Sequence, residues 1–282
     1  MKYRETYENG KRILSDSGIE NADIDARLLL EYICHTDRSY LYAHGDDELT
    51  DMQQQMYQML IDKRSSRVPL QHITGEQDFM GMTFRVNENV LIPRQDTEVL
   101  VEEAMLVTED GAKLLDMCTG SGCVLISVAR YKNDLYTVGA DISEKALAVA
   151  KSNADRLLNI ENANNPVFIQ TDLFDKIDEK FDVITSNPPY IESEVINSLE
   201  AEVKNYDPML ALDGGEDGLV IIRKLITESR NYLNNGGYLL FEIGYNQGEI
   251  CKDLMLRAGY SDVEIIKDLA GLDRVVKGRY CK

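Results

Sequence analysis

Short apolar stretches with strand character alternate with helix-like stretches from about residue 93 to the end of the chain. The strand-like runs are KLLDM (113–117), YTVGAD (136–141), PVFIQT (166–171), FDVITSN (181–187) and GYLLFEIG (237–244). Successive strands joined by a helix run parallel, because the helix returns the chain to the same end of the sheet. The alternation therefore predicts an α/β fold in which helices cover both faces of a parallel sheet.

The end of the chain departs from this alternation. The last strand-like run, DRVVKGRY (273–280), has no helix after it. It can therefore close the sheet antiparallel to its neighbours, as often happens in otherwise parallel sheets.

Residues 1 to about 75 have helical periodicity instead. In ADIDARLLLEYIC (22–34), apolar side chains recur at helical spacing at Ile24, Leu28, Leu29, Leu30 and Ile33. Thr50, followed three residues later by Gln53, predicts a capping box at the start of a further helix. On that helix we expect one stripe to pack in the core, made up of Met52, Met56, Met59 and Leu60.

Residues 79–92, FMGMTFRVNENVLI, alternate over short stretches around Asn87-Glu88-Asn89 and predict a β-hairpin between the two halves. We therefore divide the chain into a helical N-terminal domain (1–75), a hairpin linker (76–92) and an α/β domain (93–282).

Charge and cysteine usage bear on partners and compartment. The chain has 30 basic and 49 acidic residues, a net charge of −19 that disfavours broad electrostatic binding of nucleic acid. Its five cysteines are dispersed, with no C-x-x-C pair and none near a histidine at metal-ligand spacing, which indicates a reducing compartment and no metal site. The first residues lack a signal-peptide core, and no apolar stretch has the length of a membrane span. We expect a soluble, cytoplasmic protein.

The residues that follow each strand are the candidate ligand-binding residues, because open α/β sheets bind ligands beyond the carboxyl ends of their strands. After the first strand comes DMCTGSG (116–122), whose small residues let the backbone approach a ligand at the start of a helix. Asp141 ends the second strand, 19 residues beyond Gly122, a spacing at which an acidic residue binds ribose hydroxyls. A nicotinamide dinucleotide and S-adenosylmethionine both fit, and so does a ligand-free turn followed by a helix cap.

The third strand is followed by Thr171-Asp172-Leu173-Phe174. Asp172 can bind the exocyclic amine of adenine, with Leu173 against the face of the base. Taken alone, this segment is more typical of another helix cap.

The fourth strand is followed by Asn187-Pro188-Pro189-Tyr190. Two prolines lack N–H donors and make a stiff loop. The Pro188 carbonyl and the Asn187 side-chain oxygen then become fixed acceptors that can point at one planar NH₂ group, with the Tyr190 ring against its plane. The alternative is a structural Pro-Pro turn with a surface tyrosine.

Asn-Pro-Pro-Tyr after a D-x-x-T-G-S-G turn resembles the S-adenosylmethionine-dependent amino-methyltransferases, which methylate adenine N6, cytosine N4 or the glutamine amide. Further segments resemble the HemK/PrmC family, the peptide chain release factor N5-glutamine methyltransferases. They are QHITGEQDF (71–79), IPRQDTE (92–98), DP (207–208) with AL (211–212), GGEDGL (214–219) and DLAGLDR (268–274). The resemblance runs over essentially the whole chain.

The resemblance implies a Rossmann-like class I methyltransferase sheet with a small N-terminal helical domain joined by a β-hairpin. It implies methyl transfer from S-adenosyl-L-methionine to N5 of the glutamine in the Gly-Gly-Gln motif of peptide chain release factors. The expected cofactor-binding residues are Cys118, Thr119, Gly120, Ser121, Gly122, Asp141, Asp172, Leu173 and Asn187. The expected catalytic residues are Asn187, Pro188 and Tyr190, which bind substrate together with Pro189. The helical domain is expected to bind the release factor, or else only to stabilise the catalytic domain.

Three residues depart from the family pattern. Cys118 replaces a glycine, which leaves the turn intact unless that position requires positive φ. Leu173 replaces an aromatic residue beside the adenine, and Asp207 stands where glutamate is commoner before proline.

Three other functions share parts of these motifs. An adenine-N6 methyltransferase of DNA or RNA would use the same Asn-Pro-Pro-Tyr, but the acidic charge disfavours it. A nicotinamide dehydrogenase fits the glycine turn and Asp141, but all three histidines precede residue 75, so its usual acid is lacking. A non-catalytic protein could bind S-adenosylmethionine as a regulator.

Overall fold

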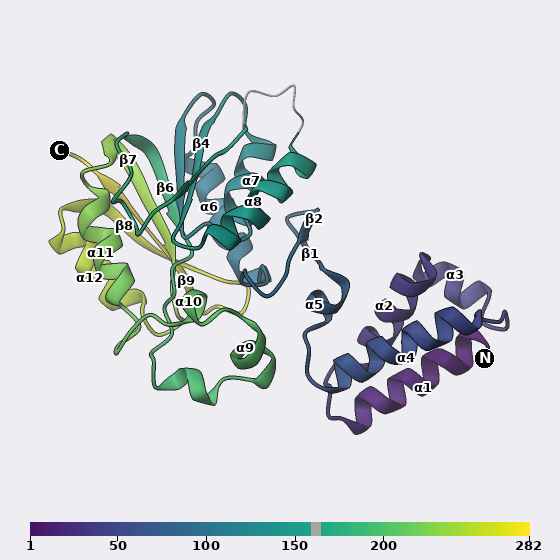
Figure 1. Ribbon diagram of the computed structural model, residues 1–282. Helices are drawn as coiled ribbons and strands as arrows, with labels where there is room; N and C mark the ends of the chain where they lie inside the picture. Colours follow the sequence, from purple (N-terminus) through teal and green to yellow (C-terminus); the bar gives the residue numbers. More distant parts are fainter. Residues whose placement is uncertain (159–164) are drawn as a thin grey trace. The chain divides into compact units, whose positions relative to one another are not determined.

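A computed structural model describes residues 1–158 and 165–282 of the chain (Figure 1). The chain forms two compact units, each with its own hydrophobic core. The helical unit comprises residues 1–76 together with 200–206, and the α/β unit comprises residues 77–199 and 207–282. The grouping of 200–206 with the helical unit was not predicted from the sequence. No helix among the described residues is long and apolar enough to cross a membrane.

The helical unit is built around the buried residues Leu14, Leu29, Leu30 and Ile61. Its helices are α1 (Tyr3–Asp16), α2 (Ala22–Cys34), α3 (Arg38–Ala43), α4 (Asp51–Ser65), α5 (Leu70–Thr74) and α9 (Ala201–Tyr206). The predicted capping box at the start of α4 is confirmed. The Gln53 N–H donates to Thr50 Oγ1 over 3.2 Å, and the Thr50 N–H donates to Gln53 Oε1 over 3.0 Å.

The predicted core face of α4 is wrong. Met52 is 71% exposed and Met56 and Met59 are also exposed, whereas Leu60 is buried as expected. The buried face of α4 consists of Tyr57, Leu60, Ile61 and Arg64. On α2, likewise, Ile24 is exposed and Asp25 is buried.

One ion pair explains both errors. Arg64 Nε donates to Asp25 Oδ2 over 2.7 Å, and both side chains are almost fully buried. The pair is acceptable in the core because each charge is neutralised and hydrogen-bonded. A charged residue on the core face interrupts the apolar periodicity from which the faces were predicted.

The predicted hairpin exists, but its turn lies earlier than expected. Strands β1 (Glu76–Phe79) and β2 (Met82–Arg85) are joined by Met80-Gly81, both with positive φ, as a tight two-residue hairpin turn requires. The turn was expected around Asn87–Asn89. There the Asn87 side chain instead accepts a hydrogen bond from the Asn89 N–H over 2.9 Å, which makes a local turn after β2.

A seven-stranded sheet forms the centre of the α/β unit, in the order β5-β4-β3-β6-β7-β9-β8. Its strands are β3 (Lys113–Met117), β4 (Tyr136–Asp141), β5 (Val167–Gln170), β6 (Phe181–Ser186), β7 (Leu233–Glu242), β8 (Tyr260–Lys267) and β9 (Asp273–Tyr280). The first five pair in parallel, and β9 is antiparallel to both β7 and β8. The antiparallel closing strand is thus confirmed. The edge strand β8 was not predicted.

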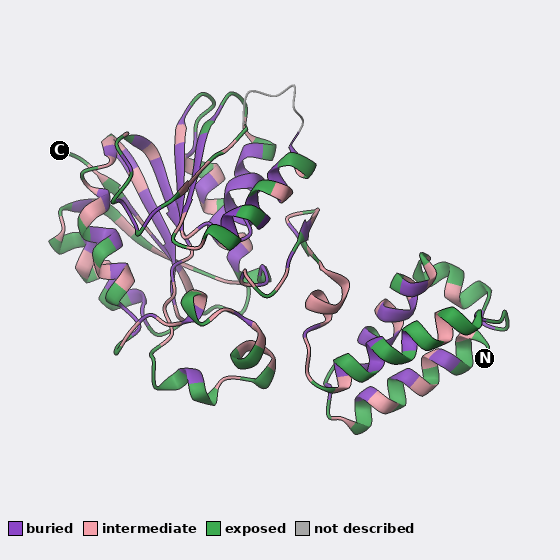
Figure 2. Cartoon of the chain, viewed as in Figure 1, coloured by how far each residue is buried: buried purple, intermediate pink, exposed green. Residues whose placement is uncertain are grey.

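Helices cover both faces of this sheet, and the strands between them are largely buried (Figure 2). The helices on the sheet are α6 (Glu98–Val107), α7 (Cys123–Tyr131), α8 (Glu144–Leu157), α11 (Val220–Ser229) and α12 (Gly248–Arg257). The short helix α10 (Met209–Leu212) and the 3₁₀ turns η1 (Gln95–Thr97) and η2 (Val195–Ser198) belong to connecting segments. Successive side chains of each strand point to opposite faces of the sheet. Leu114 packs in the core under α6 and α7, and Leu115 packs in the core under α11 and α12.

The order of the strands fixes where a ligand can bind. From β3 the chain moves outward to β4 and β5, and it then returns to place β6 on the other side of β3. A crevice opens at such a reversal, outside the carboxyl ends of the two central strands. In the sheet Met117 is level with both Ala140 and Ser186, so the segments that follow β3, β4 and β6 emerge at the same edge.

Candidate active site

A cavity lies at this edge of the sheet and brings together most of the predicted site residues. The predicted residues that line it are Cys118, Thr119, Gly120, Ser121, Asp141, Asn187 and Pro189. Residues 89–91, 93–94, 97, 208 and 210–211 contribute further parts of its wall. The cavity therefore joins the predicted cofactor turn to the Asn-Pro-Pro-Tyr loop within one unit.

Five predicted residues do not line the cavity, namely Gly122, Asp172, Leu173, Pro188 and Tyr190. Leu173 is buried in the core under α11, and Asp172 is exposed. Their contact with a cofactor stays a prediction. Pro188 is buried directly beside the lining residues Asn187 and Pro189.

The backbone of the turn after β3 is held in a left-handed conformation. Cys118, Gly120 and Gly122 have φ of +59°, +55° and +80°. The site of Cys118 thus requires the positive φ that only glycine adopts without strain. A Cβ on Gly120 would meet nothing nearer than 4.0 Å, whereas a Cβ on Gly122 would lie 2.8 Å from Ile126 Cδ1. Gly120 therefore leaves room beside the cavity, and Gly122 permits close packing of α7.

Asp141 is held in place by backbone donors. Its Oδ2 accepts from the Gly120 N–H and its Oδ1 from the Ser143 N–H, each over 2.9 Å. Burial raises the pKa of Asp141, and these two hydrogen bonds lower it. A carboxylate has about four acceptor positions, so Asp141 can still accept hydrogen bonds from ligand hydroxyls.

Asp116 is a buried site residue that sequence reasoning quoted in the turn but gave no role. Its carboxylate accepts hydrogen bonds from Thr119 Oγ1 over 2.6 Å and from Thr185 Oγ1 over 2.8 Å. Burial raises the pKa of Asp116 to about 6. An acidic residue inside an otherwise apolar strand was the signal that could have marked it.

The cysteines at the turn are not nucleophiles. Desolvation by the surrounding protein and the nearby Asp141 carboxylate raise the pKa of Cys118 to about 12. Burial likewise raises the pKa of Cys123 to about 12. Both thiols stay neutral near pH 7, and the reactive form of cysteine is the thiolate.

Asn187 is anchored through the nitrogen of its side-chain amide. Its Nδ2 donates to Thr97 Oγ1 over 3.3 Å, and Thr97 is only 1% exposed. This bond occupies the nitrogen and leaves the oxygen Oδ1 as the acceptor that the sequence predicted. Thr97 belongs to the IPRQDTE segment, for which the sequence suggested no role.

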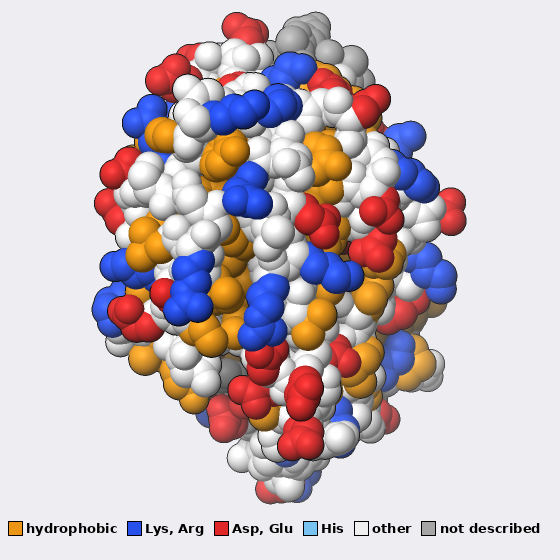
Figure 3. Space-filling view, turned by 90° about the vertical axis from the view of Figure 1, so that its left-hand side faces the viewer, with side chains coloured by type: hydrophobic (Ala, Val, Ile, Leu, Met, Phe, Trp, Pro, Cys, Tyr) orange, Lys and Arg blue, Asp and Glu red, His pale blue; other side chains and the backbone are white. Residues whose placement is uncertain are grey.

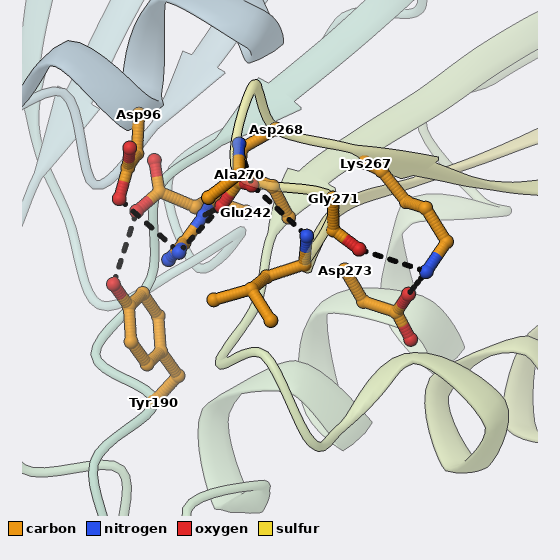
Figure 4. A network of polar contacts seen from close by, with 10 residues as sticks. Asp96, Tyr190, Glu242, Lys267, Asp268, Ala270, Gly271 and Asp273 are labelled. Atoms are coloured by element: carbon orange, nitrogen blue, oxygen red, sulfur yellow. Dashed lines mark hydrogen bonds and ion pairs between the residues drawn. The ribbon is translucent and has the colours of Figure 1, made fainter.

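Tyr190 makes polar contacts that the sequence did not predict. Its hydroxyl donates to Glu242 Oε1 over 3.0 Å, at the end of β7 (Figure 4). Its carbonyl accepts from Gln247 Nε2 over 3.0 Å. The Tyr190 ring also packs against the core under α11 and α12. The loop is thus fixed at its side chain and at its backbone.

The family-like segments meet around this loop. Arg94 Nη2 donates to Asp207 Oδ2 over 2.8 Å, joining IPRQDTE to the residue that precedes Pro208. Arg274 Nη2 lies 3.1 Å from Asp96 Oδ2 and 3.0 Å from Asp268 Oδ2. Figure 4 shows Asp96, Tyr190, Glu242 and Asp268 gathered in this network. Segments far apart in the sequence therefore support one site.

The fold and this site define the chain as an S-adenosylmethionine-dependent methyltransferase. Residues 95–271 match the family model of the methyltransferase small domain, and residues 5–75 match that of the PrmC N-terminal domain. The chain belongs to the release factor glutamine methyltransferase family, as its relatives show.

Three relatives bear the name release factor glutamine methyltransferase. The protein of Thermodesulfovibrio yellowstonii is 40% identical over 254 residues, covering 87% of this chain and 89% of the relative. That of Clostridium acetobutylicum is 36% identical over 282 residues, 98% of each chain, and that of Escherichia coli is 35% identical over 258 residues, 91% of each. A solved methyltransferase from Pyrococcus furiosus shares the fold, with a TM-score of 0.55 at 19% identity over 78% of this chain and all of that one.

Proposed function

We propose that this enzyme transfers a methyl group from S-adenosyl-L-methionine to the side-chain amide nitrogen, N5, of the glutamine in the Gly-Gly-Gln motif of peptide chain release factors. The relatives that carry this activity in their name are 35–40% identical over most of the chain. The single observation that carries the proposal is the anchored Asn187, which faces the same cavity as the glycine turn and Asp141.

The residues at the glycine turn fit the cofactor. Gly120 has no side chain to occupy the cavity, and Asp141 presents a fixed carboxylate next to it. The Asp141 carboxylate would hold the ribose hydroxyls, and the turn at 118–121 would lie against the rest of the cofactor. When bound, S-adenosyl-L-methionine supplies a methyl group that is activated by a positively charged sulfur.

Asn187 and Pro188 would prepare the substrate nitrogen for attack. An amide nitrogen is a poor nucleophile, because its lone pair is delocalised into the carbonyl. Asn187 Oδ1 and the Pro188 carbonyl can each accept one N–H of the glutamine amide and stabilise the positive charge that develops on nitrogen. The methylated nitrogen then loses one of its protons to solvent and becomes a neutral N-methyl amide. Fixed dipoles of this kind are a large source of rate enhancement. Holding the nitrogen in line with the methyl group can lower the activation barrier by up to about 7–11 kcal/mol.

Tyr190, Pro189 and the helical unit complete the proposed substrate site. The Tyr190 ring and Pro189 would limit how the glutamine side chain can lie in the loop. The helical unit, which matches the PrmC N-terminal domain, would bind the body of the release factor. Because release factors act in translation, we place the enzyme in the cytoplasm.

Nucleic acid is the main competing substrate, because Asn-Pro-Pro-Tyr also suits an exocyclic base amine. The net charge of −19 opposes binding to a phosphate backbone. On the side of the molecule seen in Figure 3, acidic and basic side chains of the described residues are mixed, and no continuous basic surface is visible.

Mass spectrometry of a release factor after incubation with enzyme and S-adenosyl-L-methionine tests the proposal. We expect one added methyl on the glutamine of Gly-Gly-Gln, none on a release factor whose glutamine is replaced, and none on duplex DNA.

Asn187→Ala should lower the single-turnover rate by about 10²–10³, as loss of one preorganised group does at an oxyanion hole. Methylation of DNA but not of the release factor would contradict the proposal.

A further inference from the structure

The Asn-Pro-Pro-Tyr loop has few backbone donors with which to fix its shape. Pro188 and Pro189 lack an N–H, so neither can donate a hydrogen bond. The Tyr190 hydroxyl donates to Glu242 Oε1, which fixes the side chain but not the backbone (Figure 4). Under the proposed function the Pro188 carbonyl must stay free for the substrate. The carbonyl of Tyr190 is therefore the group through which the backbone of the loop can be held.

One buried side chain, Gln247, holds this carbonyl. Gln247 Nε2 donates to the Tyr190 carbonyl over 3.0 Å. Its Oε1 accepts from the Gly244 N–H over 2.9 Å. Gln247 is 6% exposed, so water competes little for either bond. The amide group therefore bridges the segment that follows β6 and the segment that follows β7.

The orientation of the Gln247 amide is determined by its own turn. The Gln247 N–H donates to the Gly244 carbonyl over 2.9 Å, which closes a tight turn between β7 and α12. Because the Gly244 N–H needs an acceptor, the amide oxygen lies on that side and the NH₂ group faces Tyr190. The opposite orientation would place two donors against each other at Gly244 and two acceptors at Tyr190.

A glycine segment packs closely against the same contact. A Cβ on Gly218 would overlap the Tyr190 carbonyl oxygen and lie 2.7 Å from Gln247 Nε2. A Cβ on Gly214 would lie 2.8 Å from Tyr190 Cα. The Gly214 N–H also donates to the carbonyl of the next residue, Ile191, over 2.8 Å. The end of the loop is thus both hydrogen-bonded and closely packed.

We propose that Gln247 is a positioning residue for methyl transfer, which fixes the loop by holding the Tyr190 carbonyl. The two oxygens that bind the glutamine amide under the proposed function, Asn187 Oδ1 and the Pro188 carbonyl, then stay directed at the substrate nitrogen. The inference rests on that proposed function. Gln247 is not among the residues that line the cavity and supplies no atom to the chemistry. Its bond can still control the rate, because a shift of about 1 Å at the reacting groups can cost about 100-fold.

Gln247→Glu tests the direction of the hydrogen bond, in single-turnover methyl transfer to a release factor at saturating cofactor. Glutamate keeps the size and still accepts from the Gly244 N–H, but the ionised form turns a second acceptor toward the Tyr190 carbonyl. At about pH 8.5 we expect transfer at least about tenfold slower than in wild type.

Acidification should restore the rate of this variant. A protonated Glu at position 247 can donate its O–H to the Tyr190 carbonyl, and burial favours this neutral form. The ratio of the variant rate to the wild-type rate should therefore rise at least about fivefold from about pH 8.5 to about pH 6. Using the ratio cancels the titration of groups that the two proteins share.

Two further variants are the controls. Gln247→Met keeps the size without polar groups and should be at least about tenfold slow, with no recovery at low pH. Asn234→Asp is the matched control, because Asn234 lies at the other end of β7 and its Nδ2 donates to Asp182 Oδ1 over 2.7 Å. This change also replaces a donor by an acid, and it should leave the rate at the wild-type value throughout the pH range. Cofactor affinity should change less than about threefold in all three variants, since the Asp141 contacts remain.

The outcomes distinguish this inference from the proposed function. A wild-type enzyme that does not methylate the glutamine, or a wild-type rate for Asn187→Ala, would end both. If Asn187→Ala is slow, a wild-type rate for Gln247→Met, or for Gln247→Glu at about pH 8.5, would overturn only the role of Gln247. A rate ratio of Gln247→Glu that does not change with pH would do the same. So would a loss of cofactor affinity in step with the rate, which is the result of misfolding.

Discussion

At the scale of single residues, the sequence predicted the groups that face a ligand better than those that hold them. Gly120, Asp141 and Asn187 stand next to strand ends in recognisable motifs, and they line one cavity. Thr97 and Glu242 were given no role, because their partners lie far away in the chain. Their contacts arise only when β6, β7 and the segment before α6 come together.

The positive φ of Cys118 predicts that glycine at this position is tolerated and that valine lowers stability. Cys118 has φ of +59°, a conformation that costs a residue with a Cβ about 1–2 kcal/mol. Cys118→Gly relieves this strain and loses a small side chain, so its free energy of unfolding should stay within about 1 kcal/mol of wild type. Cys118→Val should lose more than about 2 kcal/mol, because a β-branched residue is poorly accommodated at positive φ. Urea unfolding measures both, and equal stability of the two variants would contradict the strained turn.

Asp116 predicts a pH dependence of stability. Its folded pKa of about 6 lies above the ordinary value of 3.8, so the folded state binds more protons between these values. By linkage, the free energy of unfolding falls as pH rises through this window. The loss should be about 3 kcal/mol by pH 7, and Asp116→Asn should not show it. The measurement is urea unfolding of the cofactor-free enzyme from pH 4 to pH 7.

An exposed carboxylate is the control for this experiment. Hydrogen bonds from Asn133 lower the pKa of Asp110, so its stabilising contribution is lost as pH falls, the reverse of Asp116. Asp110→Asn should therefore leave the wild-type fall between pH 4 and pH 7 in place, because its own effect appears only as pH falls below the ordinary value of 3.8. A profile of Asp116→Asn that parallels wild type would show that Asp116 is not the group that titrates.

At the scale of elements, the strands were easier to predict than the buried helix faces. Strand β9 has the predicted bounds, Asp273–Tyr280. The core faces of α2 and α4 were misassigned because the Asp25–Arg64 pair lies inside the core. The periodicity of apolar residues cannot identify a buried charged residue whose partner lies on another helix.

Gly218, which precedes α11, packs against the backbone of the Asn-Pro-Pro-Tyr loop, so a side chain at this position should lower activity. Gly218 has φ of +69°, and a Cβ there would overlap the Tyr190 carbonyl oxygen and lie 2.7 Å from Gln247 Nε2. Gly218→Ala should therefore displace the Asn-Pro-Pro-Tyr loop. We expect a loss of more than about 2 kcal/mol in stability and a fall in single-turnover rate, measured by thermal unfolding and by methyl transfer.

Gly111→Ala is the matched control for this variant. Gly111 has φ of +79°, but a Cβ there would meet nothing within 4 Å. It should show only the cost of positive φ, about 1–2 kcal/mol, and retain the wild-type rate. If Gly218→Ala is no worse in either measurement, the loop does not depend on the glycine packing.

At the scale of the whole molecule, two compact units that share no hydrophobic core predict two thermal transitions. Only the α/β unit contains the cavity and Asp141, and a ligand stabilises only the state that binds it. Saturating S-adenosyl-L-methionine, at about 100 times its dissociation constant, should stabilise that unit by about 2.7 kcal/mol and raise the transition temperature of that unit only.

Asp141→Ala should weaken cofactor binding at least about tenfold through lost charge-assisted hydrogen bonds, and should reduce the cofactor-induced rise in transition temperature accordingly. Calorimetry with and without cofactor measures both effects. A single transition that moves as a whole would mean that the helical unit and the α/β unit unfold together, and an unchanged shift in Asp141→Ala would remove this carboxylate from the cofactor site.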